Sequence, residues 1–194
     1  MTEFASDFTG GSHVERLLAG RHAICGWLSR VLDGAPAISM AIDRRARARV
    51  RVFDGDWHRI VASGYSDVEG RFRIKNGRVQ WLQGEREFAL DEAIVDVAKV
   101  TPCATLSIEL DTGEFEDHET GQKLGLGSSA ALTVALLATL LPAADVLDAA
   151  ITAHRHWQQG AGSGVDVATA VQGGLIEYQM NERTVTPLTW PSGL

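Results

Sequence analysis

A glycine loop that runs directly into an apolar helix constrains this chain more than any other stretch: "KLGLGSSAALTVALL", residues 123–137. Glycine is costly inside a helix but useful where the backbone turns sharply or approaches another group closely. We therefore expect a loop around Gly125 and Gly127, followed by two serines that begin an alanine- and leucine-rich helix. The N-terminus of such a helix presents unpaired N–H groups and a positive dipole end to an anion. A core helix that the serines merely cap is the alternative interpretation.

Length and composition are those of a soluble globular protein. The 194 residues fit one domain, and 45% hydrophobic and 22% charged residues argue against disorder. The net charge of −7 argues against a nucleic-acid partner, because phosphate contacts need a basic surface. Cys25 and Cys103 are too few for a disulfide framework. The first residues lack signal-peptide features and the longest apolar run, 129–144, is short for a membrane span, so we expect a cytoplasmic protein without a membrane partner.

Hydrophobic periodicity predicts strands mainly in the first part of the chain and helices mainly in the second. The expected strands cover residues 22–28, 37–53, 57–62, 70–75, 77–84, 104–110 and 173–179. The expected helices cover residues 90–100, 128–141, 144–159 and 164–172. A polar, acidic loop over residues 111–122 leads to the glycine loop. This order of elements favours an α+β domain.

Charged and apolar residues alternate in the second half of the long strand expected at 37–53. One face carries Arg45, Arg47, Arg49 and Arg51, and the other carries Ala46, Ala48, Val50 and Val52. A basic run can bind nucleic acid, but strict alternation is typical of an amphipathic strand with one solvated face. The acidic total charge also favours the solvated face.

The glycine loop does not match the nucleotide-binding pattern G-x-x-x-x-G-K-[ST]. It resembles instead the second motif of the GHMP kinases, the superfamily of galactokinase, homoserine kinase, mevalonate kinase and phosphomevalonate kinase. That motif reads P-x-x-x-G-L-x-S-S-A, and "GQKLGLGSSAA" (121–131) matches it except for Gly121 at the proline. Residues 19–43 resemble the opening of the family, and residues 153–174 resemble the segment with the catalytic aspartate, most closely that of phosphomevalonate kinases. The resemblance covers about residues 19–180.

This resemblance implies a ribosomal-protein-S5-like α+β fold with two layers, in which helices pack on one face of a mixed sheet. It also implies that the chain binds ATP and Mg²⁺. The residues implied at the nucleotide are Gly125, Leu126, Gly127, Ser128, Ser129 and Ala130. A hydroxyl of Ser128 or Ser129 would be a ligand of Mg²⁺, which prefers oxygen. Which of the two serines binds the metal stays open.

Asp166, in "GSGVDVA", is implied as the general base or as the group that orients the acceptor hydroxyl. An acidic residue that only stabilises the first turn of a helix is the alternative. His154 matches a histidine that is frequent in phosphomevalonate-kinase-like sequences, and a structural histidine fits equally well.

Three positions depart from the family pattern. The opening lysine falls near Arg21 or His22, and the glycine-glutamate pair becomes Gly26-Trp27. Mevalonate kinases carry a glutamate metal ligand eleven positions before the aspartate, where Arg155 stands here. Arginine keeps a positive charge with another geometry than lysine, and it cannot bind Mg²⁺.

The domain organisation expected from the resemblance has three parts. Residues 1–18 would be an N-terminal segment, residues 19–185 the ATP-binding N-terminal domain, and residues 186–194 the start of a missing C-terminal domain. The favoured function is an ATP-dependent kinase that transfers the γ-phosphoryl group to a hydroxyl or phosphate of a small metabolite, with a mevalonate-pathway-like acceptor preferred. Expected partners are that acceptor and a C-terminal GHMP domain or a second copy of the chain. The alternative is a catalytically impaired relative that binds nucleotide or a partner chain.

Overall fold

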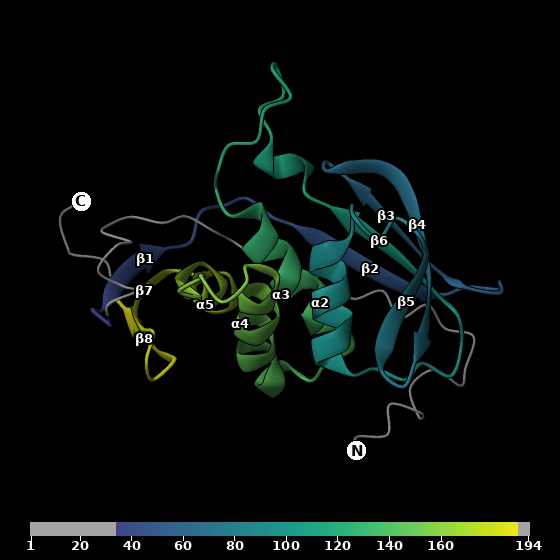
Figure 1. Ribbon diagram of the computed structural model, residues 1–194. Coiled ribbons are helices and arrows are strands. Elements are labelled where there is room, and N and C mark those ends of the chain that lie inside the picture. Colours follow the sequence, from purple (N-terminus) through teal and green to yellow (C-terminus); the bar gives the residue numbers. More distant parts are fainter. Residues whose placement is uncertain (1–33, 190–194) are drawn as a thin grey trace.

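The computed structural model describes residues 34–189 (Figure 1). The strand expected at 22–28, with Arg21, His22 and Gly26-Trp27, lies outside the described residues. The described part of the chain forms a five-stranded sheet, a group of helices and a small three-stranded sheet.

The large sheet is mixed, with the strand order β2-β6-β3-β4-β5. Its strands are β2 (Arg47–Val52), β3 (His58–Ser63), β4 (Ser66–Lys75), β5 (Arg78–Gln83) and β6 (Leu106–Asp111). Strand β6 runs parallel to β3 and antiparallel to β2, and the remaining pairs are antiparallel. The expected α+β class with a mixed sheet is confirmed.

The alternation on β2 separates a buried face from a charged one. Ala46, Ala48 and Val50 are buried, and helix α3 (Ser128–Leu140) packs on this strand. The arginines on the other face are only partly solvated, because each pairs with carboxylates. The pairs are Arg45 with Asp43, Arg47 with Asp111 and Glu114, and Arg49 and Arg51 with Glu109. This pairing neutralises much of the positive charge that the sequence places on this face.

One long strand at 37–53 is a wrong prediction, because the segment divides between two sheets. β1 (Ala37–Met40) pairs antiparallel with β7 (Leu175–Gln179), and β7 pairs with β8 (Thr184–Leu188) in the small sheet. Ala41 still bonds through its N–H to the carbonyl of Gly174, and six residues later β2 begins to pair with β6 in the large sheet. Alternation reports only which side chains are buried, so it cannot reveal that the strand changes partners.

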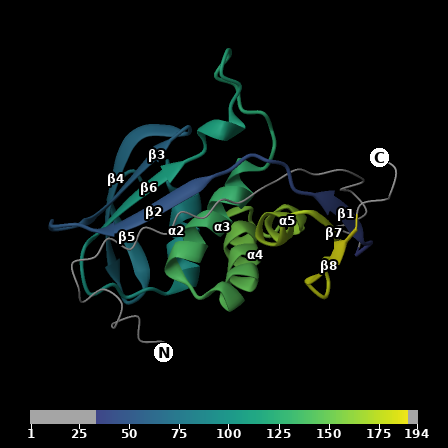
Figure 2. The ribbon, with the colours of Figure 1, turned by 180° about the vertical axis from the view of Figure 1, so that it is seen from behind.

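Helices occupy the space between the two sheets (Figures 1 and 2). Besides α3, they are α2 (Ala89–Ala98), α4 (Val146–Trp157) and α5 (Val165–Gln172). Helices α2 and α3 pack on the large sheet, α5 packs on the strands of the small sheet, and α4 contacts all three other helices. Each lies within a few residues of the prediction.

Helix α3 is buried nearly all round, with nine buried residues between Ala130 and Leu140. A helix that is apolar on every side belongs in a core, and here it joins the large sheet to the other helices. The acidic loop before it holds a short 3-10 helix, η2 (Gly113–Phe115), whose Phe115 is buried. Among residues 34–189, no helix has the length and apolar character needed to cross a bilayer.

Candidate functional site

The glycine loop adopts the backbone that its sequence predicts. Gly125 and Gly127 have φ angles of 68° and 74°, in the left-handed region that favours glycine. Gly127 is the N-cap of α3, and a Cβ atom built on Gly125 would meet no atom within 4 Å. The loop backbone is therefore open to an approaching ligand at Gly125.

Ser128 and Ser129 form the first turn of α3 but do not cap it. The N-cap is a glycine and no side chain of the described residues bonds to the end of the helix. The first bond within the helix runs from the N–H of Ala131 to the carbonyl of Gly127, so the N–H groups of residues 128–130 have no partner within the helix. The interpretation of the serines as simple caps is wrong. The first turn of α3 thus has the backbone arrangement on which the predicted anion site depends, and anion binding itself stays a prediction.

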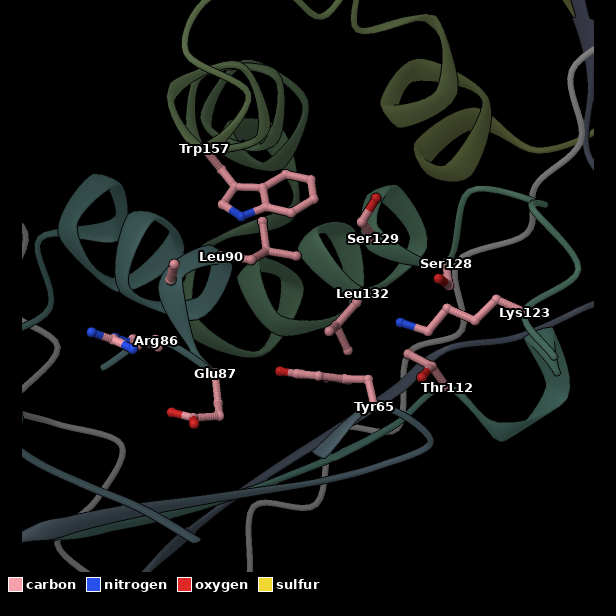
Figure 3. Close-up of a pocket in the computed structure, with 11 residues that line it drawn as sticks. Tyr65, Arg86, Glu87, Leu90, Thr112, Lys123, Ser128, Ser129, Leu132 and Trp157 are labelled. Atoms are coloured by element: carbon pink, nitrogen blue, oxygen red, sulfur yellow. The ribbon is translucent and has the colours of Figure 1, made fainter. Parts of the chain in front are cut away.

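A pocket of about 200 Å³ opens at this helix end (Figure 3). Its wall comes from the β3–β4 turn, the start of α2, the loop before α3, α3 itself and the end of α4. The lining residues are Tyr65, Arg86, Glu87, Ala89, Leu90, Thr112, Lys123, Ser128, Ser129, Leu132 and Trp157. The pocket thus joins an apolar floor and aromatic rings to two serine hydroxyls.

Lys123 supplies a positive charge beside the serines. Figure 3 shows its side chain reaching from the loop into the pocket, between Ser128 and Tyr65. The ammonium nitrogen lies over the face of the Tyr65 ring, 5.8 Å from the ring centroid, which is a cation–π distance. A helix N-terminus, two hydroxyls and an ammonium group together make an anion-binding environment.

A buried carboxyl group holds the hydroxyl of Tyr65. Its hydroxyl donates a hydrogen bond of 2.6 Å to Oδ2 of Asp91, in the first turn of α2. Asp91 is only 2% exposed, and burial raises the pKa of its carboxyl group to about 7. Burial and the neighbouring Asp91 also raise the pKa of Tyr65, so the phenol stays protonated at neutral pH.

His154 reaches the site from α4. Its Nε2 lies 3.1 Å from the hydroxyl oxygen of Ser129, and the side chain is 1% exposed. Its ring also contacts the ring of Trp157, with centroids 5.5 Å apart. The histidine that the sequence left undecided therefore supports both a pocket serine and a pocket aromatic residue.

Asp166 lies in the first turn of α5, behind Gly164, whose φ is 82°. It is partly exposed, and its Oδ1 accepts a hydrogen bond from the N–H of Val167. Helix α5 packs against α3, but Asp166 is not among the residues that line the pocket. Helices α3 and α5 thus both begin after a left-handed glycine, and the serines and the aspartate predicted to be functional lie within two positions of it.

The structure brings together only part of the predicted site. Ser128 and Ser129 line the pocket, whereas Ala130 is buried and only its backbone could face a ligand. Gly125, Leu126 and Gly127 shape the loop without lining the pocket. The residues that sequence reasoning missed are Tyr65, Arg86, Glu87, Thr112, Lys123 and Trp157. Lys123 could have been found from the sequence, because it is a charged residue at the start of the glycine loop.

The chain resembles known proteins in both sequence and structure. Residues 94–174 match the family model of the GHMP kinases N terminal domain. A phosphomevalonate kinase of Streptomyces sp. (strain CL190) is 29% identical over 199 residues, which is 90% of this chain and 52% of that protein. The chain therefore spans about half the length of this relative.

Two solved structures show the same fold. The mevalonate kinase of Methanococcus jannaschii superposes with a TM-score of 0.69 at 18% identity, covering 93% of this chain and 57% of that one. The phosphomevalonate kinase of Streptococcus pneumoniae, solved in complex with phosphomevalonate and AMPPNP, gives a TM-score of 0.63 at 18% identity, covering 86% and 49%. The predicted ribosomal-protein-S5-like fold is confirmed, as is the resemblance to the GHMP kinases.

Proposed function

We propose that the chain is the nucleotide-binding part of an ATP-dependent small-metabolite kinase, because residues 94–174 match the family model of the GHMP kinases N terminal domain. One observation carries the proposal: Ser128 and Ser129 begin α3 without capping it and line a pocket that also contains Lys123. In this arrangement a polyphosphate meets free N–H groups, hydroxyls and an ammonium at one place.

The nucleotide base would occupy the aromatic part of the pocket. Tyr65 and Trp157 line it together with Leu90 and Leu132, which suits the flat, apolar faces of a purine. The phosphates would then extend along the start of α3, over the open backbone at Gly125.

The residues fit a magnesium ion that the nucleotide itself brings. Mg²⁺ keeps several waters and is bound through phosphate oxygens and one or two protein oxygens. Among residues 34–189, no group of three or more His, Cys, Asp or Glu side chains could hold a metal. We assign the protein ligand to Ser128, because the hydroxyl of Ser129 is already hydrogen-bonded to His154. The ion would neutralise charge on the transferred phosphoryl group.

Asp166 is proposed as the group that accepts the proton of the acceptor hydroxyl. Asp166 lies in the first turn of α5, which packs against α3, and an acceptor that reaches from the pocket to this turn would meet its carboxylate. The similarity to a phosphomevalonate kinase supports a phosphorylated small acid as the acceptor.

Phosphoryl transfer from ATP tests the proposal. Asp166→Asn keeps the size of the side chain but removes the proton acceptor, and we expect turnover to fall by ~10²–10⁴. Asp148→Asn is the matched control, since Asp148 lies in the first turn of α4 and outside the site. Near-normal turnover of Asp166→Asn, with the same loss of stability as the control, would remove Asp166 from the mechanism.

A nucleotide-binding relative without catalysis is the second candidate. Arg155 stands where mevalonate kinases carry a metal-binding glutamate, and its guanidinium lies within hydrogen-bonding distance of the Gly160 carbonyl in the turn before α5. Saturable binding of Mg·ATP with no transfer to any of a set of phosphorylated and hydroxylated small acids would favour this candidate.

A further inference from the structure

We propose that Asp91 is a positioning residue for the pocket: through the hydroxyl of Tyr65 it fixes the ring on which the Lys123 ammonium rests, and so aims that ammonium at a bound polyphosphate. The proposal rests on the nucleotide site described above. It gives a role to a side chain that does not itself line the pocket.

The three residues form a continuous chain of contacts from the helix layer to the loop. The Asp91 carboxylate accepts the 2.6 Å hydrogen bond of the Tyr65 hydroxyl, and the Lys123 ammonium lies over the face of the same ring. The ring of Phe88 also contacts the Tyr65 ring, in an edge-to-face arrangement with centroids 6.1 Å apart. The hydrogen bond from the Tyr65 hydroxyl to Asp91 is therefore the polar contact that holds the ring beside Phe88.

Burial of this carboxyl group calls for an explanation beyond packing. Asp91 Oδ2 bonds to Tyr65, while Oδ1 is buried without a hydrogen-bond partner among the described residues. A buried oxygen without a partner lowers stability, and an apolar side chain at this position would avoid that loss. Holding a residue of the pocket wall is the role that the contacts of Asp91 support.

Lys123 needs such support because it belongs to an exposed loop. Residues 121–125 are exposed, and the loop is closed by the bridge between Glu116 and Lys123. A lysine side chain has many rotamers, and restricting it before the ligand arrives lowers the entropy lost on binding. The face of a fixed aromatic ring offers the ammonium one preferred place.

A double-mutant cycle on tripolyphosphate binding tests the proposal. The dissociation constant is measured by titration calorimetry for wild type, Tyr65→Phe, Lys123→Gln and the double variant. We expect Tyr65→Phe to weaken binding about two- to fivefold, the size of an exposed cation–π contact. In the Lys123→Gln background the same change should have no further effect, because Tyr65 acts through the lysine. An equal loss in both backgrounds would overturn the proposal.

Variants of Asp91 separate positioning from a merely structural role. Asp91→Ala should weaken binding as much as Tyr65→Phe does, whereas Asp91→Asn keeps an acceptor oxygen and should restore binding to within about twofold of wild type. Tyr178→Phe is the matched control, because it removes one buried hydroxyl whose bond goes to the Ser163 carbonyl, away from the pocket. It should leave tripolyphosphate binding unchanged, and equal weakening by this control would overturn the proposal.

A measurement without ligand tests the positioning role of Asp91 separately from the nucleotide assignment. In wild type, nuclear Overhauser effects should connect the ε-methylene protons of Lys123 with the ring protons of Tyr65. They should be clearly weaker in Asp91→Ala and kept in Asp91→Asn. Unchanged effects in Asp91→Ala would overturn the positioning role, whereas failure of wild type to bind tripolyphosphate, with these effects as expected, would overturn only the proposed function.

Discussion

Asp91 is a carboxyl group that the fold keeps from water, and this gives stability a predictable dependence on pH. Its pKa is raised from 3.8 to about 7, so between these values the folded state holds a proton that the unfolded state releases. The stabilising contribution is therefore complete below about pH 4 and is lost as the pH rises through 7.

Asp91→Asn removes this titration while keeping the shape of the side chain. We expect the melting temperature of the variant, relative to wild type, to rise as the pH increases from 4 to 8. Other titrating groups, such as Asp117 with its lowered pKa, cancel in the comparison. A difference between the two melting temperatures that stays constant over this range would contradict the buried, proton-binding state of Asp91.

Gly127 is a residue whose backbone angle matters more than its size. A side chain at φ of 74° costs roughly 1–2 kcal/mol in this left-handed region, so Gly127→Val should lose at least that much free energy of unfolding in urea denaturation. Gly121→Val is the matched control, with φ of 67° and open space around it. Both should be destabilised, but only Gly127→Val should also lose Mg·ATP binding. Equal binding by the two variants would place the nucleotide elsewhere.

The site was only partly predictable from single residues. The glycines and serines form one contiguous motif whose backbone needs are local, so the sequence revealed them. Tyr65 and Trp157 come from a turn between strands and from the last residue of α4, and no local pattern says that they meet. In the sequence Asp91 looks like an ordinary acid in a helix first turn, because its burial depends on the whole fold.

Among the strands, the ion pairs on the charged face of β2 are expected to add little to the free energy of unfolding. Arg47 and Arg49 pair with carboxylates, but their side chains remain more than a third exposed, and such pairs contribute ≈ 0–1 kcal/mol. Arg47→Gln with Arg49→Gln should therefore lower the free energy of unfolding by about 1 kcal/mol at most, and less at 1 M salt. Arg73→Gln, exposed on β4, controls for the loss of charge. A loss of several kcal/mol would show that the pairs hold the sheet together.

Helices were predicted better than strands for a physical reason. Helices α3, α4 and α5 are bounded by glycine or proline and are rich in alanine or leucine, so their limits depend on nearby residues. Strands depend on partners distant in the chain. The segment 37–53 pairs first with β7 and then with β6, and nothing in its own alternation marks the change.

In the whole molecule, the helices lie between the two sheets and connect them. Helix α3 packs on the large sheet and on α5, which in turn packs on the small sheet. In Figure 1 the loop before α3 extends away from the helix layer, on the side where α3 begins. The fold therefore packs α3, which begins at the pocket, against α5, which carries Asp166.

Titration calorimetry of the 194-residue chain with Mg·ATP tests whether the start of α3 holds the nucleotide. We expect saturable binding that is weakened by Lys123→Gln and abolished by Gly127→Val, with Gly121→Val as the unaffected control. At a hundredfold excess of ligand over the dissociation constant, binding should also raise the free energy of unfolding by about 2.7 kcal/mol. Absence of heat at millimolar Mg·ATP, or binding that neither Lys123→Gln nor Gly127→Val changes, would contradict the claim that the start of α3 holds the nucleotide.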